Sequence, residues 1–544
     1  MFPRLLILAA LAGIVALPFA LRPKQSAVAA TDDTVVVITP HNEALRTEFG
    51  RGFQKWYQAK TGRTVSVDWR VIGGTSEITR YLEGEYVAAY RNRWTGVLHR
   101  EWSAEVQAGF QAAKVAPDAP AAVKEARADF LASNVSSGLD LFFGGGVYDF
   151  DKQAQAGRIV ASGILTQHPE WFGAAVIPQT LGGQTFWDKE GRWIGSVLSS
   201  YGIIFNRDSW KRLGMEQDPR QWADLKDPRL IGEIGLCDPT KSGSIAAAFE
   251  NLIQQQMHLR VAALKTADPA LAARDPKTLE AQAVPEGWIE GLRLMQLIGA
   301  NARYFTDTSQ KPPIDVAAGN CAAGMCIDFY GRQQAEAVNR RDDGPDRLGY
   351  VSPPGGTSYS VDPIALMRGA PNAAVGKAFI EYVLSPEGQA VWNLRTGTPG
   401  GPARFALRRL PVRKDFYARA DLKALRSDPQ EDPFAQGDQL VYRSEWTGSL
   451  FNEMSFIIRV MCSDTHTELA QAWRAIIAAP EPQKSRALAV LQDLSVVDYA
   501  RAGGAIKQGL GAKDKSVGIR LAADLGEHFR QNYARAEAIA KGRD

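Results

Sequence analysis

The chain has 544 residues, of which 45% are hydrophobic and 23% are charged, and its formal net charge is +3. A chain of this length exceeds what one hydrophobic core normally spans, so two or three domains are expected. The 63 basic residues nearly balance the 60 acidic residues, which excludes the strongly basic face that nucleic-acid binding requires. No nucleic-acid partner is therefore expected.

The N-terminus has the pattern of an export signal. Arg4 is followed by an apolar run over residues 5–21 and then by small residues up to Ala30. This order predicts a signal peptide over residues 1–30 that is cleaved after Ala30. Because the run is about 17 residues long, an uncleaved membrane anchor is the alternative. Under both interpretations the folded part lies outside the cytoplasm.

Four cysteines, Cys237, Cys321, Cys326 and Cys462, occur in a chain that is expected to be exported. An oxidising compartment allows one or two disulfides among them, with three complete pairings open, and buried free thiols are the other interpretation. The spacing between Cys321 and Cys326 does not match a zinc knuckle, and no histidine lies beside them. No metal site is expected from the cysteines.

The order of the predicted elements indicates an α/β fold. A strand over residues 35–38 precedes a helix that starts near Asn42, and a second strand precedes a helix that starts at Thr75. This β-α-β-α order is typical of parallel strands joined by crossover helices. Residues 83–135 are rich in alanine and tryptophan and predict a helical insertion. Strand-turn-helix patterns return further along the chain, around residues 140–146, 227–253 and 322–338.

Motifs of enzyme chemistry are missing from the sequence. It contains no phosphate-binding G-x-x-x-x-G-K-[ST] loop, no H-E-x-x-H and no G-x-S-x-G. The three glycines at 144–146 lack the spacing of a dinucleotide-binding loop, and no histidine lies near Ser242 or Ser244 in the sequence. Partners of a catalytic serine can be distant in sequence, so a hydrolase is not excluded. The sequence nevertheless favours a binding protein over an enzyme, with no cofactor.

Two segments resemble a known family. The segment "SSYGIIFNRDSWKRLG" and the residues that follow it resemble the start of the second lobe in periplasmic solute-binding proteins of ABC importers. A P-x-x-W-x-D-L-x-D-P pattern in this region is formed by Pro219, Trp222, Asp224, Leu225, Asp227 and Pro228. The helix pair in "AFIEYVLSPEGQAVW" resembles the same family. The resemblance covers roughly residues 33–400, and it points to the branch that binds ferric iron, thiamine, hexose phosphates or phosphonates.

The resemblance implies a type II fold with two α/β lobes that close on a ligand. Each lobe is expected to hold a mixed, mainly parallel sheet flanked by helices. The implied units are lobe 1 over 33–195 with its insertion 83–135, lobe 2 over 196–350, a return to lobe 1 over 351–410, and a helical extension over 411–544. The chain would cross between the lobes near 195–200 and 350–354. Both additions are expected to decorate lobe 1, and a surface for a partner is the alternative. The family also implies a monomer in the periplasm with an ABC permease of the inner membrane as its partner.

Ligands of such folds bind where strands end and helices begin, in the cleft between the lobes. Two of these turns are rich in Gly, Ser and Thr, so they offer free backbone N–H groups and the positive end of a helix dipole to an anion. Ordinary helix capping is the alternative explanation of the same residues. The candidate ligand-binding residues are His41, Asn42, Gly74, Thr75, Ser76, Gly145, Gly146, Ser200, Tyr201, Thr240, Ser242, Gly243, Ser244, Asp328, Tyr330 and Arg332.

The predicted ligand is a small anionic solute that carries phosphate, phosphonate or carboxylate. Ferric iron is the alternative, because His41, Tyr330 and Asp328 supply the ligand types that it prefers. The iron-binding relatives carry paired tyrosines where this chain has Phe329 and Tyr330, so one phenolate is missing, and Arg332 nearby favours an anion. A further alternative from another class is an exported sensor domain or an enzyme on the same scaffold.

Overall fold

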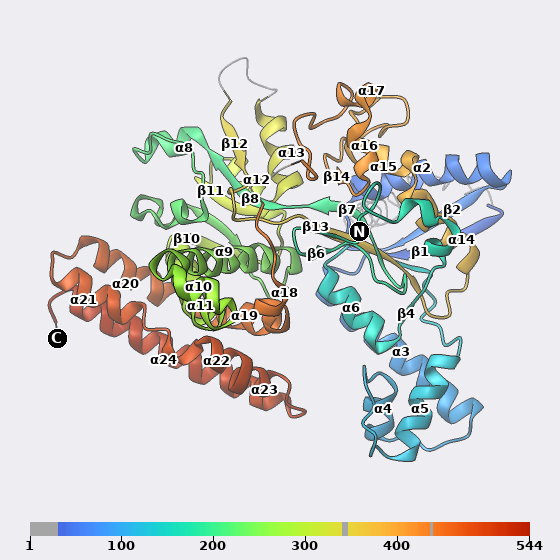
Figure 1. The fold of residues 1–544 in the computed structure, drawn as a ribbon, viewed down its shortest axis with the longest axis horizontal. Coiled ribbons are helices and arrows are strands. Elements are labelled where there is room, and N and C mark those ends of the chain that lie inside the picture. The colour runs from blue at the N-terminus through green and yellow to red at the C-terminus, as the bar shows by residue number, and fades with distance from the viewer. Residues whose placement is uncertain (1–30, 340–345, 436–438, 544) are drawn as a thin grey trace, which may run out of the picture.

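A computed structural model describes residues 31–339, 346–435 and 439–543. These residues form two α/β lobes side by side, with lobe 1 on the right and lobe 2 on the left of Figure 1. The predicted signal peptide, residues 1–30, lies outside the described residues. Within the described part of the chain, no helix combines the length and the apolar character needed to cross a membrane.

Lobe 1 is built on a seven-stranded sheet with the order β14-β7-β13-β3-β1-β2, in which β4 also pairs with β13. The run of β-branched residues in β1 is buried, with Val35, Val37 and Ile38 fully covered, as a strand between two layers of helices requires. β1 is parallel to β2 and β3, whereas β13 and β14 run antiparallel to their neighbours. The strands are β1 (Asp33–Ile38), β2 (Val65–Arg70), β3 (Leu141–Phe143), β4 (Ile159–Val160), β7 (Ile194–Ser199), β13 (Ser360–Met367) and β14 (Leu410–Pro411), with a separate hairpin of β5 (Thr180–Leu181) and β6 (Gln184–Thr185).

The helices of lobe 1 cover both faces of this sheet. In α2, Phe49 and Phe53 face the sheet and are fully buried, and Gly62 ends the helix in the left-handed conformation that favours glycine. The helical segments are α2 (Glu43–Thr61), α3 (Thr75–Asn92), η1 (Arg93–Val97), α4 (Ala104–Phe110), α5 (Ala121–Ala132), α6 (Val147–Ala156), α7 (Ile164–Gln167), η2 (Pro169–Trp171), α14 (Ala373–Leu384), α15 (Pro386–Asn393), α16 (Lys414–Ala418) and α17 (Ala420–Lys423).

The predicted insertion is helical and projects from lobe 1. It consists of the second half of α3, η1, α4 and α5, which extend away from the sheet at the lower right of Figure 1. Its own small core is aromatic: the rings of Tyr90 and Phe110 stack with their centroids 4.5 Å apart, and Phe130 contacts both edge-on. These contacts pack α3, α4 and α5 against one another, although the described residues of the insertion contain no strand.

Lobe 2 is built on a five-stranded sheet with the order β10-β9-β11-β8-β12. β9 is parallel to β10 and β11, and β8 is antiparallel to β11 and β12. The strands are β8 (Tyr201–Asn206), β9 (Ile234–Cys237), β10 (Ala302–Thr306), β11 (Ala323–Ile327) and β12 (Leu348–Val351). The helical segments are α8 (Arg207–Arg212), η3 (Trp222–Lys226), η4 (Pro228–Leu230), α9 (Gly243–Ala267), α10 (Pro269–Arg274), α11 (Pro276–Ala300), α12 (Lys311–Ala317) and α13 (Asp328–Asn339).

The chain passes between the two sheets at two adjacent places. β7 belongs to the sheet of lobe 1 and β8 to that of lobe 2, so the first crossing lies at Ser200. The return runs from Val351 at the end of β12 to Ser360 at the start of β13. The predicted lobe boundaries at residues 195 and 350 stay a prediction. In the structure the chain leaves the sheet of lobe 1 after Ser199 and the sheet of lobe 2 after Val351.

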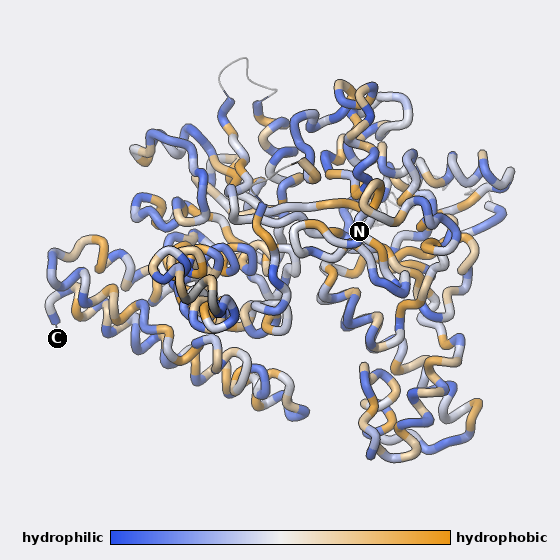
Figure 2. Tube along the Cα trace, in the orientation of Figure 1, coloured by the Kyte–Doolittle hydropathy of each residue, from blue (hydrophilic) through white to orange (hydrophobic). Residues whose placement is uncertain are grey.

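The C-terminal extension packs on lobe 2, which differs from the predicted decoration of lobe 1. After α16 and α17 the chain crosses a third time and forms a helical layer against α9 and α11 (Figure 1). Figure 2 shows hydrophobic and hydrophilic residues alternating along α24, as an amphipathic helix requires. The segments are α18 (Ser444–Thr447), η5 (Gly448–Leu450), α19 (Phe451–Ile458), η6 (Arg459–Ser463), α20 (His466–Ala478), α21 (Gln483–Leu491), η7 (Ser495–Val497), α22 (Tyr499–Arg501), η8 (Ala502–Ile506), α23 (Lys507–Leu510) and α24 (Lys515–Ala540).

Tyr533 on α24 connects this layer to lobe 2. Its hydroxyl donates to the carbonyl of Met461 at 2.8 Å and accepts from the side-chain amide of Gln296 on α11 at 3.1 Å. Tyr533→Phe is expected to lower the free energy of unfolding by about 1–2 kcal/mol, because two buried hydrogen bonds are lost. Urea unfolding followed by tryptophan fluorescence measures this change. Tyr81→Phe is the control, since Tyr81 is exposed, and equal effects of the two variants would contradict the role of Tyr533.

All four cysteines are free and buried in the structure. Of the two interpretations that the sequence left open, the structure therefore has buried thiols and no disulfide among the described residues. Burial raises the pKa of Cys321 to about 11 and moves the pKa of the other three thiols further in the same direction. None of them has the low pKa of a reactive thiolate.

Candidate functional site

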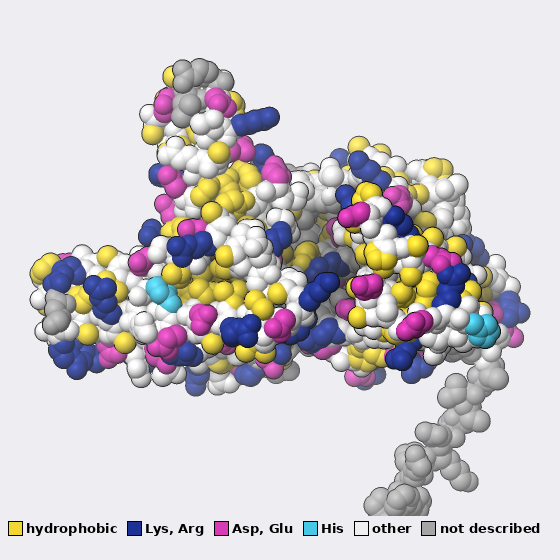
Figure 3. Space-filling model, turned by 90° about the horizontal axis from the view of Figure 1, so that it is seen from below, with side chains coloured by type: hydrophobic (Ala, Val, Ile, Leu, Met, Phe, Trp, Pro, Cys, Tyr) yellow, Lys and Arg dark blue, Asp and Glu magenta, His cyan; other side chains and the backbone are white. Residues whose placement is uncertain are grey.

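A cavity of about 410 Å³, here called the cleft, lies between the two lobes. Each lobe contributes the turns that follow its strands, namely those after β1, β2 and β3 from lobe 1 and those after β9, β10 and β11 from lobe 2. Figure 3 shows the molecule hollowed between its two bodies, with Lys and Arg side chains on the walls. The residues that line the cleft are Pro40, His41, Gly73, Gly74, Thr75, Glu77, Gly145, Lys241, Ser242, Gly243, Ser244, Asp307, Thr308, Ser309, Gln310, Ile327, Phe329, Tyr330, Asp362 and Arg409.

Two long helices from opposite lobes point their N-terminal ends at the cleft. α3 of lobe 1 begins after Gly74, and α9 of lobe 2 begins after Ser242. The two turns approach closely, since a Cβ atom on Gly74 would lie 3.5 Å from the carbonyl oxygen of Lys241. The first backbone N–H groups of each helix have no partner within the helix, so these ends favour negative charge. In α3 the carboxylate of Glu77 already supplies negative charge at this end, because it accepts from the backbone N–H of Gly74 at 3.1 Å.

Gly145 allows a third turn, between β3 and α6, to join the other two. Its φ of +127° is a conformation that glycine adopts readily. A Cβ atom there would lie 2.7 Å from Cγ2 of Thr75, so only glycine permits this contact. The turn thereby brings the start of α6 against the start of α3, and the neighbouring Gly144 packs against the ring of His41 in the same way.

Arg409 forms the basic centre of the cleft floor. Its side chain is only 2% exposed, and one guanidinium nitrogen lies 2.7 Å from Oδ2 of Asp362 while donating 2.5 Å to the hydroxyl of Ser199. The guanidinium lies over the ring of Phe329, 4.4 Å from its centroid. Its Nε has no hydrogen-bond partner among the described residues. A buried donor without a partner is costly, so a ligand atom at this position would complete the site.

His41 lies beside this ion pair and is buried. Its Nε2 is 3.3 Å from the Arg409 guanidinium and 3.5 Å from Asp362, and its Nδ1 is 3.0 Å from the hydroxyl of Thr39. Burial, assisted by the charge of Arg409, lowers the pKa of His41 below its usual value. The imidazole is therefore neutral at pH 7, with Nε2 placed to accept from Arg409 and Nδ1 to donate to Thr39. Burial likewise raises the pKa of Tyr330 to about 12, which keeps its phenol protonated.

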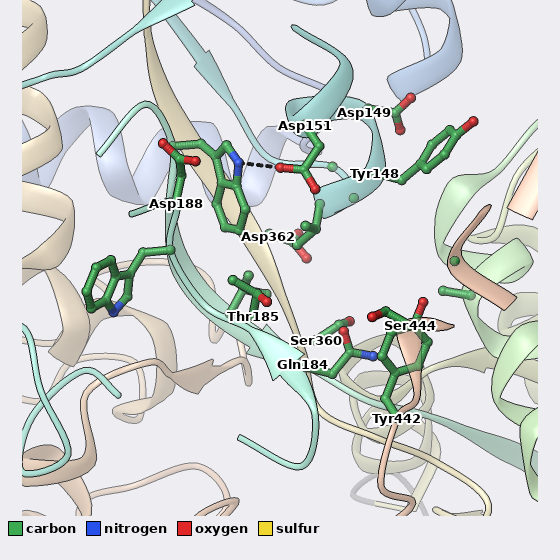
Figure 4. Close-up of a pocket in the computed structure, with 18 of the residues that line it drawn as sticks. Tyr148, Asp149, Asp151, Gln184, Thr185, Asp188, Ser360, Asp362, Tyr442 and Ser444 are labelled. Carbon is green, nitrogen blue, oxygen red and sulfur yellow. Dashed lines mark hydrogen bonds between the residues drawn. The ribbon is translucent and has the colours of Figure 1, made fainter. Parts of the chain in front are cut away.

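A second cavity, here called the side compartment, has a volume of about 820 Å³ and adjoins the cleft. The two cavities share Gly145, Gly243, Ser244 and Asp362 as lining residues. Figure 4 shows the space between carboxylates of lobe 1, such as Asp149, Asp151 and Asp188, and Tyr442 and Ser444 of the C-terminal segment. The β5–β6 hairpin supplies another wall through Gln184 and Thr185.

Comparison with known proteins identifies the family. A family model described as bacterial extracellular solute-binding protein matches residues 135–416, just over half of the chain. The chain belongs to this family. The predicted recognition is confirmed, as is the two-lobe type II fold, although the antiparallel pairs contributed by β8, β12, β13 and β14 make both sheets more mixed than expected.

Individual relatives are distant. An uncharacterized protein of Haemophilus influenzae is 24% identical over 251 residues, which cover 46% of this chain and 59% of that protein. The phosphoglycerate transport regulatory protein PgtC of Salmonella typhimurium is 21% identical over 198 residues, covering 36% of this chain and 40% of that protein. The matched parts thus span less than two thirds of either relative. The structure of the periplasmic binding protein AfuA from Actinobacillus pleuropneumoniae, with exogenous fructose-6-phosphate bound, has a TM-score of 0.46 at 16% identity over 81% of this chain and 98% of that one.

The structure of this solute-binding protein brings half of the sixteen candidate residues together in the cleft. These are His41, Gly74, Thr75, Gly145, Ser242, Gly243, Ser244 and Tyr330. Two others, Gly146 and Tyr201, line the side compartment, where the Tyr201 hydroxyl is 3.1 Å from that of Ser360. The turns that the sequence assigned to strand ends of both lobes therefore do face one another, while ligand contact by these residues stays a prediction.

The other six candidates line neither cavity. Asn42 caps α2 by accepting from the backbone N–H of Leu45, and Thr240 donates to Asp238 within the turn before α9. Ser76 lies in the first turn of α3, outside the lining of both cavities, and Ser200 is buried at the first crossing with its hydroxyl lacking a partner among the described residues.

The structure places Asp328 and Arg332 outside the lining of both cavities. Arg332 donates to Asp328 at 2.6 Å in a buried ion pair, and its Nε lies 3.5 Å from Asp428. His41 and Tyr330, by contrast, line the cleft. The suggested contacts of Asp328 and Arg332 with a ligand stay a prediction.

Sequence reasoning missed the five charged residues that line the cleft, which are Glu77, Lys241, Asp307, Asp362 and Arg409. Lys241 stands between two predicted residues in the sequence, so its position in the turn was a usable signal. Asp362 and Arg409 come from β13 and from the segment before β14, more than 100 residues beyond the turn that they complete. Only the pairing of β13 and β14 with β7 places them there, and no local pattern marks them.

Glu250 on α9 faces the side compartment and is 4% exposed. Burial raises its pKa from 4.5 to about 7, despite hydrogen bonds from Thr447 and Tyr442. The folded state thus holds this proton more tightly than the unfolded state, so the contribution of Glu250 to stability is present at low pH and is lost as pH rises toward 7.

Glu250→Gln is expected to remove this pH dependence. Between about pH 5.5 and about pH 7.5 the wild-type chain should lose about 2 kcal/mol of unfolding free energy that the variant retains. Urea unfolding of both proteins at the two pH values measures the difference. A difference between the proteins that is the same at both pH values would contradict a raised pKa at Glu250.

Proposed function

We propose that this chain is the extracytoplasmic receptor of an ABC importer and that it captures a small anionic solute between its lobes. The solute carries phosphate, phosphonate or carboxylate. One observation carries the proposal: Lys241, Arg409 and the first turn of α9 face the same cavity between two lobes. A helix N-terminus next to two basic side chains is a suitable site for such an anion.

The acidic residues of the cleft leave this site available to an anion. Asp362 is neutralised by Arg409, and Glu77 is paired with Arg80 at 2.7 Å. Asp307 is exposed at the rim. No ion pair is found for Lys241 among the described residues, so its charge is free to meet a ligand. The hydroxyls of Ser244 and Thr75 likewise have no partner in the described part of the chain, and they add two donors from opposite lobes.

The relative PgtC supports a phosphorylated solute, since its name connects it with phosphoglycerate transport. Membership of a solute-binding family supports a periplasmic location, a permease of the inner membrane as partner, and binding rather than catalysis. We expect the receptor to act as a monomer. Closure of the two lobes on the ligand would couple affinity to the movement at Ser200 and between residues 351 and 360.

A thermal-shift screen of the ligand-free protein tests this function. The compounds are phosphoglycerate, hexose phosphates, phosphonates, ferric iron, thiamine and polyamines. A phosphorylated or carboxylated compound is expected to stabilise the protein, by about 2.7 kcal/mol at a concentration of about 100 times its Kd. Stabilisation by ferric iron alone, or by organic cations alone, would overturn the proposal.

Ferric iron is the second candidate because His41 and Tyr330 line the same cavity. The guanidinium of Arg409, 3.3 Å from Nε2 of His41, disfavours it by placing a positive charge beside a trication. A sensor of the same solute is a third candidate, since the name of PgtC refers to regulation. A signalling partner recovered with the ligand-bound protein, in place of a permease, would favour the sensor.

A further inference from the structure

The side compartment and the cleft form two connected parts of one binding region. They meet at the start of α9, where Gly243 and Ser244 line both, and at Asp362. Together they offer far more room than a phosphate group needs, and each alone is in the size range of a small-molecule site. A ligand whose anionic group lies at the N-terminus of α9 can therefore extend into the side compartment.

We propose that the ligand is bipartite, with an anionic group in the cleft and a protonated amine in the side compartment. This proposal rests on the proposed function of the cleft and specifies the remaining part of the solute. It is carried by the carboxyl groups that line the side compartment and by the aromatic rings around it.

The side compartment is rich in carboxyl groups. Six acidic side chains line it, namely Asp149, Asp151, Asp188, Glu190, Glu250 and Asp362. Its two basic side chains are Lys189, which is exposed, and Arg192, which is paired with Asp188 at 2.7 Å. No ion pair with a described residue is found for Asp149, Asp151 or Glu250. A protonated amine would supply the cation that these three carboxyl groups lack.

Glu250 presents an oxygen to the cavity. The hydroxyls of Tyr442 and Thr447 both donate to Oε1, at 3.0 and 2.6 Å. No described residue donates a hydrogen bond to Oε2, and Glu250 lines the side compartment. Oε2 is therefore available to a donor group of a ligand bound there.

Aromatic side chains surround the same space. Tyr148, Trp187, Trp193, Tyr201 and Tyr442 line the compartment, and Asp151 accepts from the indole N–H of Trp193 at 2.8 Å (Figure 4). Aromatic faces next to carboxylates are the chemistry that binds organic ammonium groups.

The wall nearest Glu250 is built by the C-terminal segment. Tyr442, Ser444 and Phe451 lie beyond residue 416, where the match to the family model ends. The third crossing of the chain thus closes a compartment that the matched residues alone would leave open on this side. The amine-binding part is accordingly a property of this chain's extension rather than of the two lobes.

Calorimetric titration of the full exported chain tests the proposal with matched probes. The probes are ω-aminoalkyl phosphates of increasing chain length, each compared with the alkyl phosphate and the ω-hydroxyalkyl phosphate of the same length. At one length the amine is expected to tighten binding about tenfold over both partners, which corresponds to one charge-assisted hydrogen bond. Glu250→Gln should bring this ratio close to one, because the amide keeps the contacts of Oε1 but carries no charge.

Two further variants keep the test decisive. Asp149→Asn on α6 should also reduce the ratio, which provides an independent readout if Glu250→Gln folds poorly. Glu290→Gln, an exposed site on α11, is the control and should keep the ratio of wild type. Equal affinities for the three probe types at every length would overturn the amine proposal and leave the anion site standing. Failure of every phosphate probe to bind would overturn the proposed function and this inference together.

Discussion

Replacing Lys241 and Ser244 together by alanine is expected to weaken, about 100-fold, the binding of whichever phosphorylated compound stabilises the protein in the thermal-shift screen. Both residues line the cleft at the start of α9, and one supplies a cation while the other supplies a hydroxyl donor. Hydrogen bonds to a charged group contribute about 1.5–3 kcal/mol each, and about 2.7 kcal/mol corresponds to a factor of 100. Calorimetric titration of the wild type and the variant measures the ratio of dissociation constants.

Thr240→Ala is the matched control in the same turn. The Thr240 hydroxyl donates to Asp238 at 2.7 Å and lines neither cavity, so its loss should change the affinity less than about threefold. The sequence alone suggested both Thr240 and Ser244 as ligand contacts, whereas only Ser244 lines the cleft. The two variants test this difference. Equal losses for the control and the double variant would show that the whole turn, rather than its cleft-facing atoms, determines affinity.

The fold was accessible from the sequence where local pattern and tertiary structure agree. The β-branched run of β1, the cap at Asn42 and the apolar face of α2 with Phe49 and Phe53 each predict the element that the structure contains. The strand order of the two sheets depends instead on β13 and β14 returning to β7 over a long sequence distance. No local pattern encodes that pairing, and the family resemblance implied only that residues 351–410 return to lobe 1.

The C-terminal extension shows the limit of pattern reading. Its helices were predictable from helical periodicity, but their place was not, because an amphipathic helix shows that it needs a hydrophobic partner without showing which one. Here α11 presents buried residues such as Trp288, whose indole donates to the carbonyl of Val497. The shared core with lobe 2 explains why α11 is hydrophobic on more than one side.

The candidate site was half predictable for a similar physical reason. Gly, Ser and Thr at strand-to-helix turns mark a place where the backbone is free to bind a ligand, and six such candidates do face the cleft. Charge is different, because an arginine gives no sign in the sequence of whether an internal carboxylate already neutralises it. Both arginines are paired with a carboxylate, Arg332 with Asp328 and Arg409 with Asp362, and only Arg409 lines the cleft.

Arg409→Ala is expected to lower the free energy of unfolding by about 3–5 kcal/mol, the largest stability effect of any substitution considered. The side chain is 2% exposed and holds the crossing strands together through Asp362 on β13 and Ser199 on β7. Its removal leaves the partly buried Asp362 without its cation, and breaking such a pair costs more than the pair itself contributes. Urea unfolding followed by fluorescence measures the change.

A double variant separates the charge effect from lost packing. If the cost arises mainly from the unpaired carboxylate, Arg409→Ala combined with Asp362→Asn should be more stable than Arg409→Ala alone, since neutral Asn leaves no buried charge. Arg404→Ala, an exposed arginine in the same segment, should change the unfolding free energy by less than about 0.5 kcal/mol. A double variant less stable than Arg409→Ala would assign the loss to the packing of the guanidinium on Phe329, 4.4 Å from its ring centroid, rather than to charge. Arg409 also lines the cleft. Ligand titration of the same variants would therefore test whether the arginine that stabilises β7 and β13 also binds the anion.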